Sequence, residues 1–238
     1  DAVQQLERVS KAPRDEATAI MQEIYETPVK SELIAQRISE IKAAGAVVCG
    51  SLTPQSVQQH YEVAVEAGLD ILVIQGTVVS AEHVSSNGAA LNLKEFIADI
   101  PIPVIVGGCA SYQTALHLMR TGAEAVLVGV GPGAPCTTRG VLGVGVPQAT
   151  AISDASAARV QHLLETGNYV NVIADGGMRT GGDIAKAIAC GAGAVMVGSP
   201  LAHSISPVMH NAAFRAAGAD AVYLPLVASS ADDFIMFA

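Results

Sequence analysis

The chain has 238 residues, of which half are hydrophobic, and a formal net charge of −9. This length and hydrophobic content allow one large α/β domain. The acidic balance and the lack of a Lys/Arg cluster argue against a nucleic-acid partner. The apolar runs are too short to cross a bilayer, so we expect no membrane partner either. The start at Asp1 and the end at Ala238 suggest a fragment.

The four cysteines are spaced too widely for a CxxC pair or a metal-ligand pattern. No secretory leader is recognisable at the amino end. Together these features predict a reducing, cytoplasmic setting.

Residues 1–43 carry apolar side chains at helical spacing, interrupted at Thr27-Pro28, and predict two or three helices. After them, a short apolar run, a polar or Gly-rich loop and a helix recur several times. The predicted strands are Ala46–Cys49, Ile71–Ile74, Val104–Val106, Ala125–Val128, Val170–Ala174, Ala194–Val197 and Ala221–Leu224.

Runs that are apolar at every position are typical of strands covered on both faces, as in a parallel sheet flanked by helices. The helices between them end in glycine, which supplies a left-handed cap: Gly45, Gly68, Gly122, Gly191 and Gly218. The repeat fits a β/α barrel or a doubly wound sheet. We favour an incomplete or rearranged TIM-type barrel of about seven strands, because polar and Gly-rich residues follow nearly every strand.

The most informative loop, GVGPGAPCTTR (129–139), directly follows a predicted strand. Its glycines would let backbone groups converge on a ligand or an ion, and Cys136 lies in a polar turn beside two hydroxyl residues, Thr137 and Thr138. Composition alone leaves two interpretations open: a nucleophilic cysteine, or a surface turn with an inert thiol.

Two further strand ends carry polar and glycine residues. In ADGGMRTGGD (174–183), Asp175 could accept hydrogen bonds from ribose hydroxyls, and the glycines would let a phosphate approach the backbone. Asp183 is better explained as a helix cap. The next strand ends in VGS (197–199), so both ends together predict a phosphate site.

These motifs resemble the IMP dehydrogenase and GMP reductase family, and in particular its IMP dehydrogenase-related third subfamily. The same subfamily is matched by GVGVPQATAI (143–152), DILVIQGT (70–77), SAEH (80–83) and TALHLMRTG (114–122). The resemblance covers about residues 15–202. It implies a purine mononucleotide substrate (IMP or GMP), NAD or NADP as cofactor, and a homo-oligomer.

The resemblance also implies roles for individual residues. Cys136 would add to purine C2, with hydride moving between C2 and a nicotinamide. Thr138 would assist the water or ammonia step. The remaining implied groups are the Gly131, Gly133 and Cys136 carbonyls for potassium, Asp175 for the ribose, Gly177, Gly198 and Ser199 for the phosphate, and Gln75 and Gly76 on the cofactor side.

Three residues depart from many IMP dehydrogenases in a way that suits the third subfamily. Ala134 stands in place of a phosphate-binding Ser, Gln75 in place of an Asp, and Cys109 in place of an Asn.

The last segment resembles a different family. GSPLAHSISPVMHNAAF (198–214) and DAVYLP (220–225) are similar to the amino terminus of shikimate dehydrogenase, whose paired serines, here Ser204 and Ser206, bind the shikimate carboxylate. We therefore expect a chimera, natural or made, with its junction within 197–202. Its parts would be a helical lead-in (1–43), a barrel portion with the nucleotide site (44–202) and a βα-type segment of the same domain (203–238).

Three functional hypotheses follow. The first is a purine-nucleotide oxidoreductase that uses Cys136. The second is a non-catalytic chimeric domain that at most binds a nucleotide or phosphate, because the flap expected after residue 198 is replaced. The third, a shikimate dehydrogenase fragment, is the weakest, because that family's catalytic residues and dinucleotide domain would lie beyond Ala238.

Overall fold

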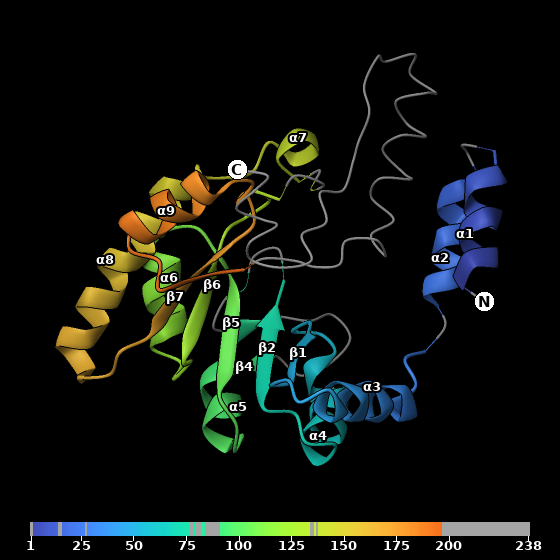
Figure 1. Cartoon of the computed structure of the whole chain (residues 1–238), viewed down its shortest axis with the longest axis horizontal. Coiled ribbons are helices and arrows are strands. Elements are labelled where there is room, and N and C mark those ends of the chain that lie inside the picture. The colour runs from blue at the N-terminus through green and yellow to red at the C-terminus, as the bar shows by residue number, and fades with distance from the viewer. Residues whose placement is uncertain are drawn as a thin grey trace.

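The protein is described here by a computed structural model, which covers residues 2–13, 16–26, 28–76, 79, 82–83, 91–133, 136 and 138–196. Three helices come first, as predicted: α1 (Ala2–Lys11), α2 (Ala17–Tyr25) and α3 (Ser31–Ala43). The first two pack side by side, away from the sheet (Figure 1). The third packs against α4 (Val57–Glu66), at the start of the β/α repeat.

Among the described residues, six parallel strands form the central sheet, in the order in which they occur in the chain. They are β1 (Cys49–Leu52), β2 (Ile71–Gln75), β5 (Val104–Cys109), β6 (Ala125–Val128), β7 (Asn171–Asp175) and β8 (Ala194–Met196). A doubly wound sheet reverses its strand order at a switch point, whereas a barrel adds each strand beside the previous one. The sheet is therefore the incomplete TIM-type α/β fold that the sequence predicts.

The helices that follow the strands and cover one face of the sheet are α5 (Leu93–Asp99), α6 (Tyr112–Met119), α8 (Gln148–Thr166) and α9 (Gly181–Ala189) (Figure 1). The short helix α7 (Thr138–Leu142) lies beyond the ends of the strands and has no buried residue. Three of these helices begin with side-chain caps, in which Asn92, Ser111 and Thr180 accept hydrogen bonds from backbone N–H groups of the first turn. Asp183 lies in the first turn of α9 rather than at its cap, and its carboxylate accepts from the Thr180 hydroxyl and the Arg179 N–H.

A contact across the sheet shows that it is curled. Gln75 at the end of β2 donates to Asp175 Oδ2 at the end of β7 over 3.0 Å, although β5 and β6 lie between the two strands. In a flat sheet these strands would be about 14 Å apart, with side chains pointing out of the plane rather than toward each other. The contact therefore requires barrel-like curvature.

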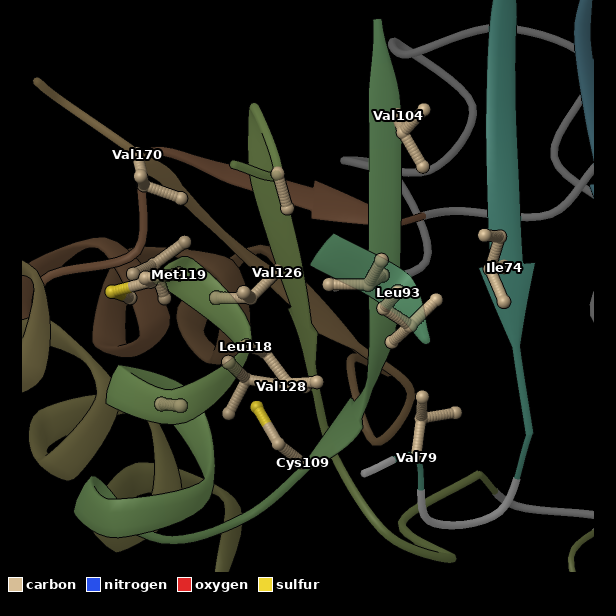
Figure 2. Packing of buried hydrophobic residues seen from close by; sticks show 14 of the residues in the cluster. Ile74, Val79, Leu93, Val104, Cys109, Leu118, Met119, Val126, Val128 and Val170 are labelled. Carbon is tan, nitrogen blue, oxygen red and sulfur yellow. The ribbon is translucent and has the colours of Figure 1, made fainter. Parts of the chain in front are cut away.

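The core lies between the sheet and its helices. Val126 and Val128 of β6 pack toward Leu118 and Met119 of α6 (Figure 2). Leu127, which lies between those two valines in the sequence, is also buried, because the residues of a strand alternate between the two faces of a sheet. Both faces of β6 are thus covered, as its unbroken apolar run predicts.

The first predicted strand is displaced along the chain, so the expected range Ala46–Cys49 is wrong. The Val48 N–H donates to the Asp70 carboxylate over 2.8 Å, and the Val48 carbonyl accepts from the N–H groups of Asp70 and Ile71. Registered pairing with β2 begins only at Cys49 and continues to Leu52. Val47 is 70% exposed, so its apolar character reflects no burial.

The other predicted strands within the described residues agree with the structure to within a few residues at their ends. The helix-terminal glycines are confirmed, with positive φ at Gly45, Gly68, Gly122 and Gly191. A short antiparallel pair, β3 (Glu82–His83) and β4 (Leu91–Asn92), was not predicted. The predicted strand Ala221–Leu224, Gly218 and the proposed segment 203–238 lie outside the described residues. Within the described ranges, no helix is long and apolar enough to span a membrane.

Candidate active site

A cleft of about 300 Å³ opens at the carboxyl ends of the central strands. Its walls come from β2, β5, β7 and the loop after β6: Gln75, Gly76, Gly108, Gly129, Gly131, Pro132, Gly133, Cys136, Thr138, Asp175 and Gly176. A larger hollow of about 670 Å³ is lined by residues that precede β6 and β7, and so lies at the opposite end of the sheet. We place the site in the smaller cleft, because barrel enzymes work at the carboxyl ends of their strands and the exposed thiol lies there.

Cys136 is exposed at the edge of this cleft. Its Sγ lies 3.3 Å from Thr138 Oγ1, and the pKa of the thiol is lowered, first by the Thr138 side chain and then by the Thr138 backbone N–H. The charge of Arg139 lowers it further, while partial burial opposes the shift. The thiolate is the nucleophilic form of cysteine, so this turn favours a reactive thiol.

Arg139 fixes the shape of the loop that carries Cys136. Its Nε donates to the Val130 carbonyl over 3.0 Å and its Nη2 to the Val146 carbonyl over 2.6 Å. The guanidinium thereby joins the beginning of the loop to the segment before α8. Sequence reasoning assigned no role to this residue, because its partners are backbone carbonyls, which no motif reveals.

Asp175 is the half-buried carboxyl group of the cleft. Burial raises its pKa, and the hydrogen bond from the Gln75 amide partly offsets that rise. Gln75 in turn accepts from the Ser51 hydroxyl over 3.4 Å. These two hydrogen bonds, from Ser51 to Gln75 and from Gln75 to Asp175, thus join the ends of three strands. The structure brings Gln75 and Asp175 together, whereas sequence reasoning placed them on the cofactor and substrate sides.

Gln148, the first residue of α8, is a second group without a role in the sequence prediction. Its Nε2 donates to the Val128 carbonyl over 2.6 Å and to the Asp175 carbonyl over 3.2 Å. The sequence offered one signal, a polar residue at the start of the helix that comes after the cysteine loop and α7. Its hydrogen-bond partners could not be predicted, because they depend on the curled sheet.

Gly129 shows how tightly the loop leaves β6. Its φ is +149°, and a Cβ at this position would lie 2.3 Å from the Asp175 carbonyl oxygen. Such a contact is impossible without movement of the backbone, so only glycine fits here.

The other predicted site glycines within the described residues surround Pro132. Gly131 and Gly133 line the cleft, and the Gly133 carbonyl accepts from the Cys136 N–H over 3.0 Å. Gly177 packs against Pro132, while its neighbour Gly176 faces the cleft. The predicted residues Gly198, Ser199, Ser204 and Ser206, together with Ala134, lie outside the described residues.

Gly76 lines the cleft but has its backbone groups in use. Its N–H donates to the Gly107 carbonyl over 2.9 Å, and its carbonyl accepts from the Gly108 N–H over 3.0 Å. Gly76 therefore has no N–H left to donate, and it gives the cleft a wall without a side chain.

Cys109 is a core residue, in contrast to Cys136. It is 1% exposed, its thiol lies near Val128 and Leu118, and burial raises its pKa to about 12 (Figure 2). Its thiol donates to the Leu127 carbonyl over 3.5 Å. Among the described residues, no three His, Cys, Asp or Glu side chains gather as metal ligands.

Comparison with known proteins supports the family suggested by these motifs. The model of the IMP dehydrogenase / GMP reductase domain matches residues 3–209. The chain belongs to the IMP dehydrogenase/GMP reductase family. The match extends the resemblance expected for about residues 15–202 in both directions, and it includes the leading helices.

Relatives in this family cover different shares of the chain. An uncharacterized oxidoreductase of Mycobacterium tuberculosis (strain ATCC 25618 / H37Rv) is 50% identical over 206 residues, which are 85% of this chain and 55% of the relative. The inosine-5'-monophosphate dehydrogenase of Escherichia coli (strain K12) is 48% identical over 146 residues, which are 61% of this chain and 28% of the enzyme. The chain thus spans about half the length of its mycobacterial relatives.

A solved structure supports both family and fold. The IMP dehydrogenase/GMP reductase-like protein of Corynebacterium glutamicum (ATCC 13032 Kitasato) is 45% identical and superposes with a TM-score of 0.71, over 83% of this chain and 51% of that protein. A second family model, the shikimate dehydrogenase substrate binding domain, matches residues 196–237, which confirms the second resemblance. The two matches overlap over 196–209, and the expected junction at 197–202 falls within that overlap.

Proposed function

We propose that the chain provides the nucleotide site of a purine-nucleotide oxidoreductase, with Cys136 as the nucleophile. The observation that carries the proposal is the exposed Cys136 thiol, whose pKa is lowered by Thr138 and which shares a cleft with the Asp175 carboxylate. Family membership supports the reaction class.

In this proposal the Cys136 thiolate forms a bond from Sγ to purine C2. Oxidation of IMP then removes hydride from C2, and water releases the product from sulfur as the C2–S bond breaks. In the GMP direction ammonia leaves from C2 of the covalent purine, hydride is then added to C2, and the C2–S bond breaks to return the Cys136 thiolate. Thr138 lies 3.3 Å from the sulfur, which places its hydroxyl where it can assist the entering water or the leaving ammonia.

Asp175 is the proposed ribose ligand. Its Oδ2 accepts from Gln75, and no group among the described residues donates to Oδ1, which we assign to a ribose hydroxyl. The carboxylate is held by a neutral amide rather than by a cation, which leaves its charge available for the substrate. Gly177, Gly198 and Ser199 remain the proposed phosphate ligands.

NAD or NADP would supply the group that accepts or donates hydride. The described residues are compatible with the nicotinamide end of this cofactor, because Gly76 leaves one wall of the cleft free of side chains. Gln75 can still offer one N–H of its amide, since the other donates to Asp175. The cleft is at the lower end of ligand-pocket volumes, so it suits a nicotinamide ring rather than a whole dinucleotide.

A potassium ion would be held by the Gly131, Gly133 and Cys136 carbonyls. Rings of backbone carbonyls are suitable potassium ligands. The Gly133 carbonyl uses one lone pair for the Cys136 N–H and keeps the second for an ion, so the donor chemistry fits.

The nucleophile is tested by incubating the chain with 6-chloropurine ribotide and locating the adduct by peptide mass spectrometry. Cys136 should be modified, and excess IMP or GMP should protect it. The matched control is Cys49, which is also exposed to solvent. Partial burial of its thiol raises the pKa, so Cys49 should not react under the same conditions. An unmodified Cys136 at saturating ribotide would contradict the nucleophile assignment.

Hydride transfer is tested separately, with IMP plus NAD or NADP and with GMP plus the reduced cofactors, followed at 340 nm. Turnover in one direction identifies the substrate. Ribotide binding with no transfer in any combination would select the alternative of a chimeric domain that binds but does not catalyse.

The last segment, residues 203–238, is a second candidate binding site, with shikimate as the ligand to test. Its family match is to a substrate binding domain alone, so we expect no shikimate oxidation. If Ser204 and Ser206 retain their proposed role, the chain binds shikimate, and Ser204→Ala abolishes that binding without affecting the labelling of Cys136.

A further inference from the structure

We infer that Gln148 is a positioning residue, which sets the geometry between the Cys136 loop and Asp175. This inference rests on the proposed function, since it concerns the same two groups. It adds a residue that does not contact the reacting atoms and to which the sequence analysis gave no role, although Gln148 lies within the motif of residues 143–152.

Gln148 joins two strands just where their pairing ends. The last registered pair between β6 and β7 is Val128 with Ala174. The Gln148 amide donates to the Val128 carbonyl over 2.6 Å and to the carbonyl of Asp175, one residue further along β7, over 3.2 Å. A side chain from α8 thereby continues the link between the strands at the floor of the cleft.

The amide can be oriented in only one way. Both partners are carbonyl oxygens, which accept hydrogen bonds, so the NH₂ group must face them and Oε1 must point away. Oε1 is buried and has no partner among the described residues. A buried acceptor without a partner is unfavourable. The two hydrogen bonds that the Gln148 amide donates therefore determine the position of this side chain, at the expense of Oε1.

The surroundings leave no room for the link to change. A Cβ at Gly129, where the cysteine loop begins, would lie 3.0 Å from Gln148 Nε2 as well as 2.3 Å from the Asp175 carbonyl oxygen. Gly129, Gln148 and Asp175 are thus packed against one another. Loss of the amide would let the start of the loop and the end of β7 shift relative to each other, and Cys136 would move with the loop.

The test replaces Gln148 with methionine, which keeps the length of the side chain and removes both hydrogen bonds. The matched control is Gln161→Met on the same helix, because among the described residues the Gln161 amide donates to the exposed Glu165 and bonds no strand. The first measurement is the pH dependence of Cys136 alkylation by iodoacetamide, resolved by peptide mass spectrometry. The second is kcat and KM in the direction that wild type supports.

In Q148M, we expect the alkylation midpoint of Cys136 to move to higher pH, because a displaced loop weakens the contact with Thr138. A shift of about 1 Å in a reacting group can lower a rate by about 100-fold, so kcat should fall by about that factor, with KM changing less. Q161M should match wild type in both measurements.

The inference is wrong if Q148M melts at a lower temperature yet keeps the wild-type alkylation midpoint and kcat, because Gln148 would then be only structural. If Q148M does not fold, Q148E has the same shape and sets a carboxylate against the two carbonyls, and the same measurements decide. Alkylation does not depend on turnover. An inactive wild type would therefore refute the proposed function and still leave the role of Gln148 testable.

Discussion

Gly129→Ala is the substitution whose effect follows most directly from the structure. Gly129 has a φ of +149°, which alanine adopts only with strain. The new Cβ would lie 2.3 Å from the Asp175 carbonyl oxygen and 3.0 Å from Pro132 Cγ. Two independent penalties therefore fall on one methyl group.

The size of the loss can be estimated by adding the two penalties. Backbone strain of this kind costs about 1–3 kcal/mol, and overpacking costs a further 1–3 kcal/mol. Their sum is about 2–6 kcal/mol, and a central value of about 4 kcal/mol corresponds to a fall in Tm of roughly 8–16 °C for a chain of this size. Cys136 should also be alkylated more slowly at neutral pH, since the loop that carries it must move.

Thermal unfolding followed by circular dichroism measures the loss, with two glycines as controls. Gly143→Ala isolates backbone strain, because its φ is +67° and nothing lies within 4 Å of the added Cβ. We expect it to lose about 2–4 °C. Gly140→Ala has neither strain nor contact and lies in α7, so its Tm should not fall.

The reasoning would be refuted by a Gly129→Ala protein that melts no lower than Gly143→Ala. That result would mean that the Asp175 carbonyl moves aside freely, so the link between β6 and β7 would not be rigid.

Two further predictions concern the ionisable groups of the cleft. Thr138→Val should raise the pKa of Cys136, because it removes the hydroxyl that lowers it, and the pH midpoint of Cys136 alkylation should rise while Thr138→Ser stays near wild type. Asp175→Asn should weaken ribotide binding in a titration yet raise Tm at pH 7.5. Burial raises the folded-state pKa of Asp175, so its stabilising contribution is present below the unfolded-state pKa and is lost as the pH rises through the folded-state value. The gain in Tm should therefore vanish at acidic pH, and a gain that persists there would contradict burial as the cause.

The sequence predicts the sheet well, because burial on both faces leaves a direct signature. The run Ala125–Val128 is apolar at every position and is a strand over the same residues. The predicted strand Ala46–Cys49 was wrong for two reasons. Val47 is exposed, and the Val48 N–H donates to the Asp70 carboxylate before the registered pairing with β2 begins. Local composition does not reveal such side-chain competition.

The parts of the candidate site that depend on residue type could be predicted from the sequence. The contacts that depend on the curvature of the sheet could not. Cys136 and Thr138 lie two residues apart, so the sequence already puts both side chains in one turn. Gln75 and Asp175 are 100 positions apart and meet only because the sheet curls. Gln148 escaped prediction for the same reason, since its partners come from two different strands.

The strand order has a consequence for how the chain folds during synthesis. Each strand of the six-stranded sheet pairs with the one that precedes it in the sheet, so no strand must wait for a distant later segment. On the ribosome, the nascent chain can add one β/α unit at a time to a growing edge, beginning at β1. Each step joins neighbouring β/α units, the longest connection running from Val128 to Asn171, and such sequential pairing favours rapid folding. An arrested nascent chain that ends after β7 should already protect β2 and β5 from hydrogen exchange.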